Sequence, residues 1–195
     1  MTVYDEIYEL AEPYWQTRAN DVHVPGAYRL ARRLLAAIPE ADEAIVVPAI
    51  LLHDCGYALV PEEDHLKGLA GAPIGWEADI TRRHEIEGAR LAGEILARVG
   101  YEPGRIRRIQ AIIDGHDSRE EALDVEDQVV KDADKLWRFS EDGVRIAHVW
   151  MSLTPAAFMD YVEARIDTWF FTDAARELAR ELLAGSRAAF ADAAA

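Results

Sequence analysis

The feature that most constrains the fold is the segment of residues 48–56, where an apolar run ends in His53, Asp54, Cys55 and Gly56. Such a run belongs in a protein core. A carboxylate at its end costs free energy unless a cation or hydrogen-bond donors meet it, and a metal ion is one such partner. If the run is helical, His53 and Asp54 flank one edge of the helix end, because neighbouring residues point about 100° apart. The pair is therefore either a plain cap of a core helix or part of a metal site, and the rest of the chain must decide.

The charge of the chain limits the partners that we expect. The 195 residues include 36 Asp and Glu against 21 Lys and Arg, a formal net charge of −15. Such a surface repels nucleic acid backbones and anionic lipid, so we expect neither a long nucleic acid nor a membrane as a partner. A small phosphorylated substrate is still allowed, because a bound metal reverses the local field.

Cysteine usage and hydropathy suggest a cytoplasmic protein. Cys55 is the only cysteine, so no intrachain disulfide is possible. The first residues do not have the pattern of a signal peptide, and no apolar stretch reaches the roughly 18 residues of a membrane helix.

Apolar residues recur at helical spacing along most of the chain, and we find no convincing strand pair. The pattern predicts an all-α fold of about eight to ten helices in a single domain, residues 1–195. Asn20 or Asp21 is the expected N-cap of the second helix. Residues 57–75 should form a loop, which we expect to act as a substrate lid. The predicted helices are residues 2–18, 21–38, 40–53, 77–99, 105–115, 125–139, 141–151, 155–170 and 173 onward.

Histidines at similar places in successive helices form the main chemical pattern. His23, His53, His84 and His116 follow one another roughly thirty residues apart. An apolar-led helix then carries Asp132 and Asp134. Because residues two apart point to nearly opposite faces of a helix, at most one of these acids can face the same site as the histidines.

At this point the chain resembles the HD superfamily of metal-dependent phosphohydrolases, over roughly residues 20–140. Leu-Leu-His-Asp-Cys-Gly at 51–56 is similar to the apolar-His-Asp-x-Gly segment of that family. Residues 83–89 are similar to the His-x-x-x-Gly-Ala helix of its longer branches, and residues 112–116 to their Ile-x-x-His helix end. The resemblance makes residues 141–195 a C-terminal helical extension of the domain.

The resemblance implies a metal set. The first metal would be held by His23, His53, Asp54 and Asp134, with Asp132 as the alternative to Asp134. A second metal would be held by His84 and His116, with Asp54 bridging both ions. His84 is alternatively a residue of a solvated helix face, and His116 a helix C-cap. Imidazole and carboxylate ligands suit one or two divalent ions of Fe, Mn, Co, Ni or Zn.

The resemblance also implies a function, hydrolysis of a small phosphorylated molecule by a metal-activated hydroxide, with a nucleotide as the leading candidate. Asp54 would act at the metals, Asp132 would orient water, as Asp114 or Asp117 could, and Lys135 lies beside the ligand. Candidates for binding the phosphate are Arg82, Arg83 and Arg138.

Two other functions remain open. Some enzymes with the HD fold carry a similar ligand set with two irons in a mixed-valence pair and use O₂ to cleave C–C or C–P bonds. A non-catalytic metal- or nucleotide-binding module is the second alternative. The aromatic residues beyond position 141 should be core, and an exposed patch among them would give a homodimer interface.

Overall fold

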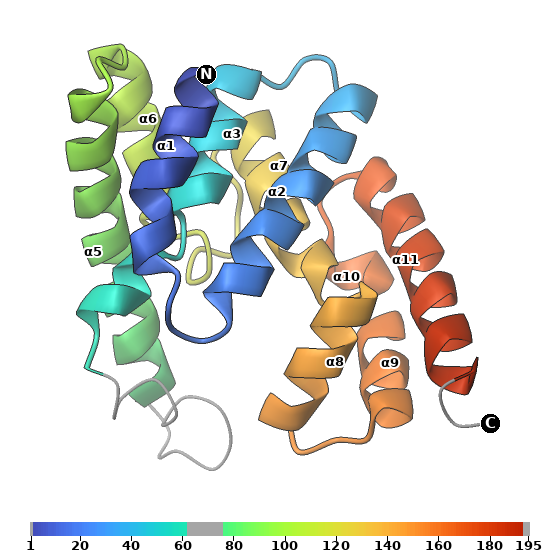
Figure 1. Ribbon diagram of the computed structural model, residues 1–195. Helices are drawn as coiled ribbons and strands as arrows, with labels where there is room; N and C mark the ends of the chain where they lie inside the picture. Colours follow the sequence, from blue (N-terminus) through green and yellow to red (C-terminus); the bar gives the residue numbers. More distant parts are fainter. Residues whose placement is uncertain (1, 62–75, 193–195) are drawn as a thin grey trace.

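The computed structural model describes residues 2–61 and 76–192, and within them every regular element is helical (Figure 1). The all-α prediction is confirmed, with ten α-helices and two short 3₁₀ helices in the described part. The predicted lid at 57–75 falls mostly outside the described residues. The elements are α1 Val3–Ala11, η1 Glu12–Tyr14, α2 Asn20–Ala37, α3 Glu43–Leu52, η2 Cys55–Leu59, α5 Trp76–Arg98, α6 Pro103–Ile113, α7 Val125–Trp137, α8 Glu141–Trp150, α9 Pro155–Glu163, α10 Ile166–Trp169 and α11 Asp173–Asp192.

Helix α3 is the centre of the fold. Its N-cap Asp42 accepts a hydrogen bond from the backbone N–H of Ala44 at 2.9 Å. Every residue from 45 to 52 is buried, because α1, α2, α5, α6 and α7 all pack on this helix. Figure 1 shows α5 and α6 at one side of the molecule, α8 to α11 at the opposite side, and α3 with α7 between them. The apolar run that leads to His53 and Asp54 therefore forms the innermost helix.

Two glycines let α5 approach the end of α3. A Cβ on Gly56 would lie 1.9 Å from the carbonyl oxygen of His84, and a Cβ on Gly88 would lie 3.1 Å from that of His53. No side chain fits at Gly56. Gly56 is not what ends the helix, because α3 already ends at Leu52. The glycine instead allows η2 and α5 to touch, which brings His84 towards His53.

The start of α2 differs from the prediction. Asn20 is the first helical residue, and the N-cap is Ala19, which makes no side-chain cap. Arg18 and Ala19 both have φ near +55°, so the chain turns sharply into the helix. The side-chain amide of Asn20 donates to the carbonyl of Asp54 at 3.5 Å. The predicted cap was wrong because Asn20 joins α2 to the end of α3.

The C-terminal helices pack on the same core as the rest of the chain. Helix α11 contacts α2, α7, α8, α9 and α10, and one cluster of buried apolar side chains extends from Ile7 to Leu183. The single helix predicted over 155–170 is divided into α9 and α10. Within residues 2–61 and 76–192, no helix is both long and apolar enough to cross a membrane.

Candidate metal centre

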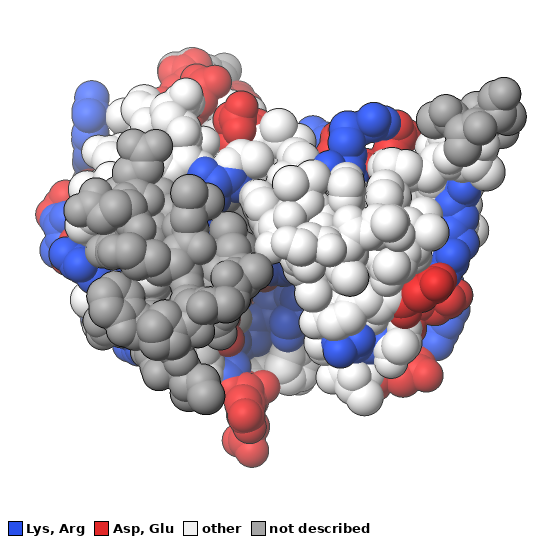
Figure 2. Space-filling view, turned by 90° about the horizontal axis from the view of Figure 1, so that it is seen from below, with Lys and Arg blue, Asp and Glu red and all other residues white. Residues whose placement is uncertain are grey.

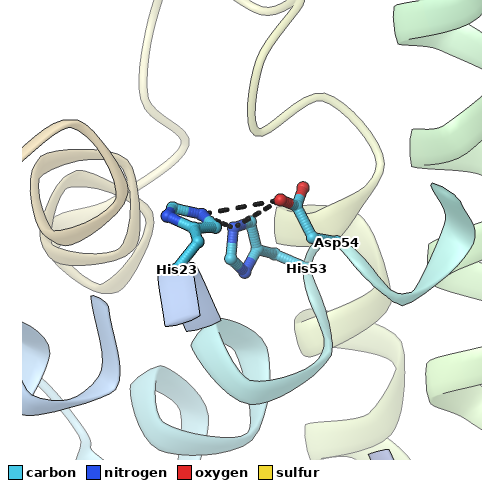
Figure 3. A group of neighbouring side chains, drawn as sticks. All are labelled: His23, His53 and Asp54. Carbon is cyan, nitrogen blue, oxygen red and sulfur yellow. Dashed lines mark hydrogen bonds and ion pairs between the residues drawn. The ribbon is translucent and has the colours of Figure 1, made fainter. Parts of the chain in front are cut away.

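The first side-chain group joins the start of α2 to the end of α3. His23 lies in the first turn of α2, and His53 and Asp54 follow α3 directly. The Nε2 atoms of the two histidines are 3.1 Å apart. Asp54 Oδ2 lies 3.5 Å from Nε2 of His23 and 3.6 Å from Nε2 of His53. Figure 3 shows the three side chains pointing towards one another.

Asp134 on α7 completes this group. Its Oδ1 is 3.1 Å from Nε2 of His23 and 3.7 Å from Nε2 of His53. One helical turn later, Arg138 Nη1 lies 3.6 Å from Asp134 Oδ2. The structure thus brings together His23, His53, Asp54 and Asp134, the four residues that the resemblance assigned to a first metal.

A second group lies on the other side of Asp54. His84 comes from α5 and His116 from the turn after α6, and their Nε2 atoms are 3.4 Å apart. Asp54 Oδ1 is 3.8 Å from Nε2 of His84 and 3.4 Å from Nε2 of His116. The two carboxylate oxygens of Asp54 are therefore divided between two pairs of histidine Nε2 atoms.

Asp117 adds a carboxylate to the second group. Its Oδ2 is 3.6 Å from Nε2 of His84 and 3.8 Å from Nε2 of His116. This resembles the place of Asp134 in the first group. From the sequence, Asp117 is expected only as one of several residues that could orient water. The available signal was its position directly after His116, which ties its backbone to that of a candidate ligand.

The histidine rings are oriented as metal ligands require. The Nδ1 atoms of His53, His84 and His116 lie 2.8, 3.3 and 2.9 Å from backbone carbonyl oxygens, so each Nε2 is left for the site. The ring of Tyr57 stacks on that of His84 at 3.9 Å. Two nitrogens that are each about 2.1 Å from one ion lie roughly 3.0–3.4 Å apart, which matches both Nε2 pairs.

The ring of His23 is held differently. Its Nδ1 has no hydrogen-bond partner among the described residues, and the ring packs edge-on against Trp137 with 4.8 Å between the ring centroids. The donor set as a whole still fits divalent transition-metal ions, because it combines imidazole nitrogens with carboxylates.

Electrostatics keep both inner carboxylates ionised. Burial alone would raise the pKa of Asp54, but His53 and His116 outweigh it and hold that pKa below its usual range. Burial would likewise raise the pKa of Asp134, but Arg138 and His23 hold it well below its usual value. Burial, together with His116, lowers the pKa of His84 to about 4, which leaves a neutral ring with an available lone pair. Burial would lower the pKa of His116, but Asp117 and Asp54 outweigh it and raise that pKa to about 10, so a metal ion that binds there would replace a proton on that ring.

Two buried charged residues that the sequence analysis did not single out hold the turn that carries His116 and Asp117. The Glu85 carboxylate is fully buried and accepts hydrogen bonds from the backbone N–H groups of Asp117, at 2.9 Å, and Ser118, at 2.7 Å. The Lys131 ammonium donates to the carbonyl oxygens of Gly115, His116 and Arg119 at 2.7–2.9 Å. This turn is therefore fixed from α5 and from α7.

Asp132 is placed elsewhere. Its carboxylate accepts hydrogen bonds from the backbone N–H groups of Phe171 and Thr172, at 2.9 and 3.0 Å, and from the Thr172 hydroxyl at 2.7 Å. It thus anchors the start of α11, and the water-orienting role expected for it is corrected to a structural one. Of these two acids on α7, only Asp134 faces the histidines. This matches the expectation that residues two apart point to nearly opposite faces of a helix.

The four cationic side chains that were predicted near the site lie in different places. Arg82 pairs with Glu85 and Asp114, and Arg83 is exposed on α5. Lys135 donates to the carbonyl of Trp169 at 3.3 Å, and only Lys135 and Arg138 of the predicted set line a cavity beside the ligands. Cys55 is buried, which raises the pKa of its thiol to about 12, so it stays a protonated core residue.

A small cavity of about 40 Å³ opens onto the first group and Asp117. This volume suits ions and a few waters and not an organic molecule. Figure 2 shows a hollow on one face of the molecule, with Lys and Arg atoms at its floor. The residues around the cavity are Arg18, Asn20, His23, Asp54, Tyr57, Asp117, Asp134, Trp137, Arg138 and Trp150.

Comparison with known proteins agrees with this geometry. A family model described as HD domain matches residues 21–138, more than half of the chain. All six residues predicted as metal ligands fall inside the matched range. No curated protein matches the chain, and no solved structure does.

Proposed function

Because this chain belongs to the HD domain family, we propose that it is a metal-dependent phosphohydrolase acting on a small phosphorylated molecule, with a nucleotide as the leading candidate. The family consists mostly of metal-dependent hydrolases. One observation carries the proposal: the two carboxylate oxygens of Asp54 each face a separate pair of histidine Nε2 atoms.

We propose two metal positions on the basis of these donor atoms. His23, His53 and Asp134 would hold the first ion, and His84, His116 and Asp117 the second, with Asp54 shared between them. Two bound divalent ions supply a water of lowered pKa and neutralise charge on the phosphoryl oxygens. The residues of the chain orient the donors, exclude bulk water by their burial and present cations at the cavity.

Arginines at the cavity suit an anionic substrate. Arg18 and Arg138 both line the small cavity beside Asp54 and Asp134. A guanidinium carries five N–H donors, so Arg138 can pair with Asp134 and still donate to a phosphate oxygen. This local positive charge counters the overall charge of −15, and it favours a small phosphorylated molecule over a long polyanion.

The first experiment is elemental analysis of chain purified without chelator, paired with measured phosphate release from a panel of nucleotides. We expect two transition-metal ions per chain and metal-dependent phosphate release. His84→Ala should lose one ion and most of the activity. His148→Ala is the matched control, because His148 donates from α8 to the carbonyl of Leu153 and is not in either group. A single ion that persists in His84→Ala would overturn the dinuclear site.

The same samples separate the alternative functions when electron paramagnetic resonance is added to report the valence of any iron. Iron found as a mixed-valence pair, without phosphate release, would replace the proposal by the oxygenase function. Two bound ions without a mixed-valence iron pair, and without phosphate release from any nucleotide of the panel, would leave a metal-binding module.

A further inference from the structure

A second, larger cavity continues from the metal centre. It has a volume of about 380 Å³, which lies in the range of roughly 300–1,000 Å³ that is typical of small-molecule sites. Asp117 and Asp134 line both this cavity and the smaller one, so the two spaces meet at the candidate ligands. A molecule whose phosphate reaches the metals would have the rest of its body in the larger cavity.

The wall of the larger cavity comes mainly from the chain beyond the family match. The match ends at residue 138. The far wall is built by Trp150 at the end of α8, Phe158 and Tyr161 on α9, and Trp169 on α10. Trp150, Tyr161 and Trp169 are only partly buried. The HD domain therefore supplies the candidate metal ligands, and the C-terminal extension supplies an aromatic wall that the family match does not account for.

Charge is distributed unevenly in this cavity. Arg18 and Arg138 lie at the end shared with the metal ligands. Arg18 is held there by stacking, with its guanidinium carbon 4.4 Å from the ring centroid of Tyr57 and 5.8 Å from that of Trp150. Two of the three cations that line this cavity therefore lie where a phosphate would be, while the third, Lys135, donates to the carbonyl of Trp169 at 3.3 Å. Tyr161 and Trp169 line the larger cavity but not the smaller one, so their rings lie where the rest of the substrate would be.

We infer that the aromatic wall formed by Trp150, Tyr161 and Trp169 is a binding site for the planar base of a nucleoside monophosphate, whose phosphate is held between Arg18, Arg138 and the metal centre. The inference rests on the proposed function and adds the substrate class and the residues that select it. Partly buried aromatic rings bind bases by stacking. The volume of the cavity, about 380 Å³, is large enough for one nucleotide.

The test compares a substrate with a base and one without it. We would measure kcat/KM of the metal-loaded full chain for the four common ribonucleoside 5′-monophosphates and for ribose 5-phosphate. The wild-type chain should prefer at least one nucleotide over ribose 5-phosphate. In Trp169→Leu and in Tyr161→Leu the ratio of the two kcat/KM values should fall at least tenfold, equivalent to about 1.4 kcal/mol.

The control is Tyr28→Leu. Tyr28 is also a partly buried tyrosine, but it lies on α2 and lines a different cavity together with Tyr4 and Tyr8. In Tyr28→Leu, the ratio of kcat/KM for the nucleotide to kcat/KM for ribose 5-phosphate should equal that of the wild-type chain. Metal content and the far-ultraviolet circular dichroism of each variant report whether the chain is folded and loaded, and two variants are used so that one misfolded chain does not decide the result.

Calorimetric titration with the same nucleotides keeps the inference separate from the proposed function. If the wild-type chain hydrolyses nothing but binds a nucleotide, and Trp169→Leu weakens that binding at least tenfold, the inference stands and the proposed function fails. If the chain hydrolyses ribose 5-phosphate as well as every nucleotide, or if the variants leave the ratio unchanged, the inference is overturned. Absence of binding and of hydrolysis for all four nucleotides also overturns it.

Discussion

At the scale of single residues, the candidate metal centre depends on Asp54. Its position directly after His53 at the end of the most buried helix lets one carboxylate face two directions, with Oδ2 towards His23 and His53 and Oδ1 towards His84 and His116. A buried carboxylate surrounded by imidazole nitrogens costs free energy unless cations accompany it. Asp134 and Asp117 add one carboxylate to each side, so the two positions have equivalent donor sets.

The role of Asp117 gives a prediction at this scale. We expect Asp117→Asn to weaken binding of the second ion by roughly 10- to 100-fold, because an amide is a poorer ligand than a carboxylate, and to leave the first ion in place. Competitive titration with a chromogenic chelator measures both affinities. Asp114→Asn is the control, since Asp114 is exposed and pairs with Arg82. Equal affinities in Asp117→Asn and the wild-type chain would remove Asp117 from the site.

At the scale of elements, the contact between η2 and α5 determines whether there is a second group at all. His84 reaches Asp54 only because Gly56 and Gly88 let the two backbones touch. The turn after α6 depends in the same way on other elements, since Glu85 from α5 and Lys131 from α7 hold its backbone. Asp132 shows a third use of a charged side chain, as the anchor of α11.

Gly56→Ala tests the contact between η2 and α5. The added Cβ would lie 1.9 Å from the carbonyl oxygen of His84, so we expect a loss of about 1–3 kcal/mol in the free energy of unfolding and a loss of the second ion. Urea denaturation and elemental analysis check the two effects. The control is Gly185→Ala in α11, where a Cβ would meet nothing within 4 Å and should stabilise the helix by roughly 0.5–1 kcal/mol. Unchanged stability in Gly56→Ala would contradict the close contact.

At the scale of the whole molecule, the candidate ligands link elements that are far apart in the sequence. They come from the start of α2, the end of α3, α5, the turn after α6, and α7. Metal binding should therefore stabilise the entire helical core, because ions that bind only the folded chain shift the unfolding equilibrium.

Removal of the metal gives the corresponding prediction. We expect a chelator to lower the melting temperature by roughly 10–20 °C, since each of the two proposed ions, present at one hundred times its Kd, contributes about 2.7 kcal/mol. Differential scanning calorimetry measures the change, and adding the native ion back should restore the original value. A melting temperature that does not respond to chelation would show that the chain folds around its buried carboxylates without metal.

The sequence by itself predicted the helical fold and the family, which are confirmed, and it gave six candidate ligands, which stay a prediction. Apolar spacing is a local property, and it placed α5, α6 and α7 within a few residues of their observed bounds. The His-Asp pair at the end of an apolar run was informative because a buried carboxylate must be paired with a cation, hydrogen-bonded or bound to a metal. The N-cap of α2 was wrong because Asn20 bonds to a residue 34 positions away.

Only the tertiary structure decided how these residues meet. The division of Asp54 between two histidine pairs, the approach of Asp117 and the separation of Asp132 from Asp134 all depend on distances between different helices. The turn held by Glu85 and Lys131 and the aromatic wall from α8 to α10 could not be predicted, because such contacts join residues that no local pattern relates. The sequence specifies the type of each side chain, whereas the distances between side chains of different helices follow from how the helices pack around α3.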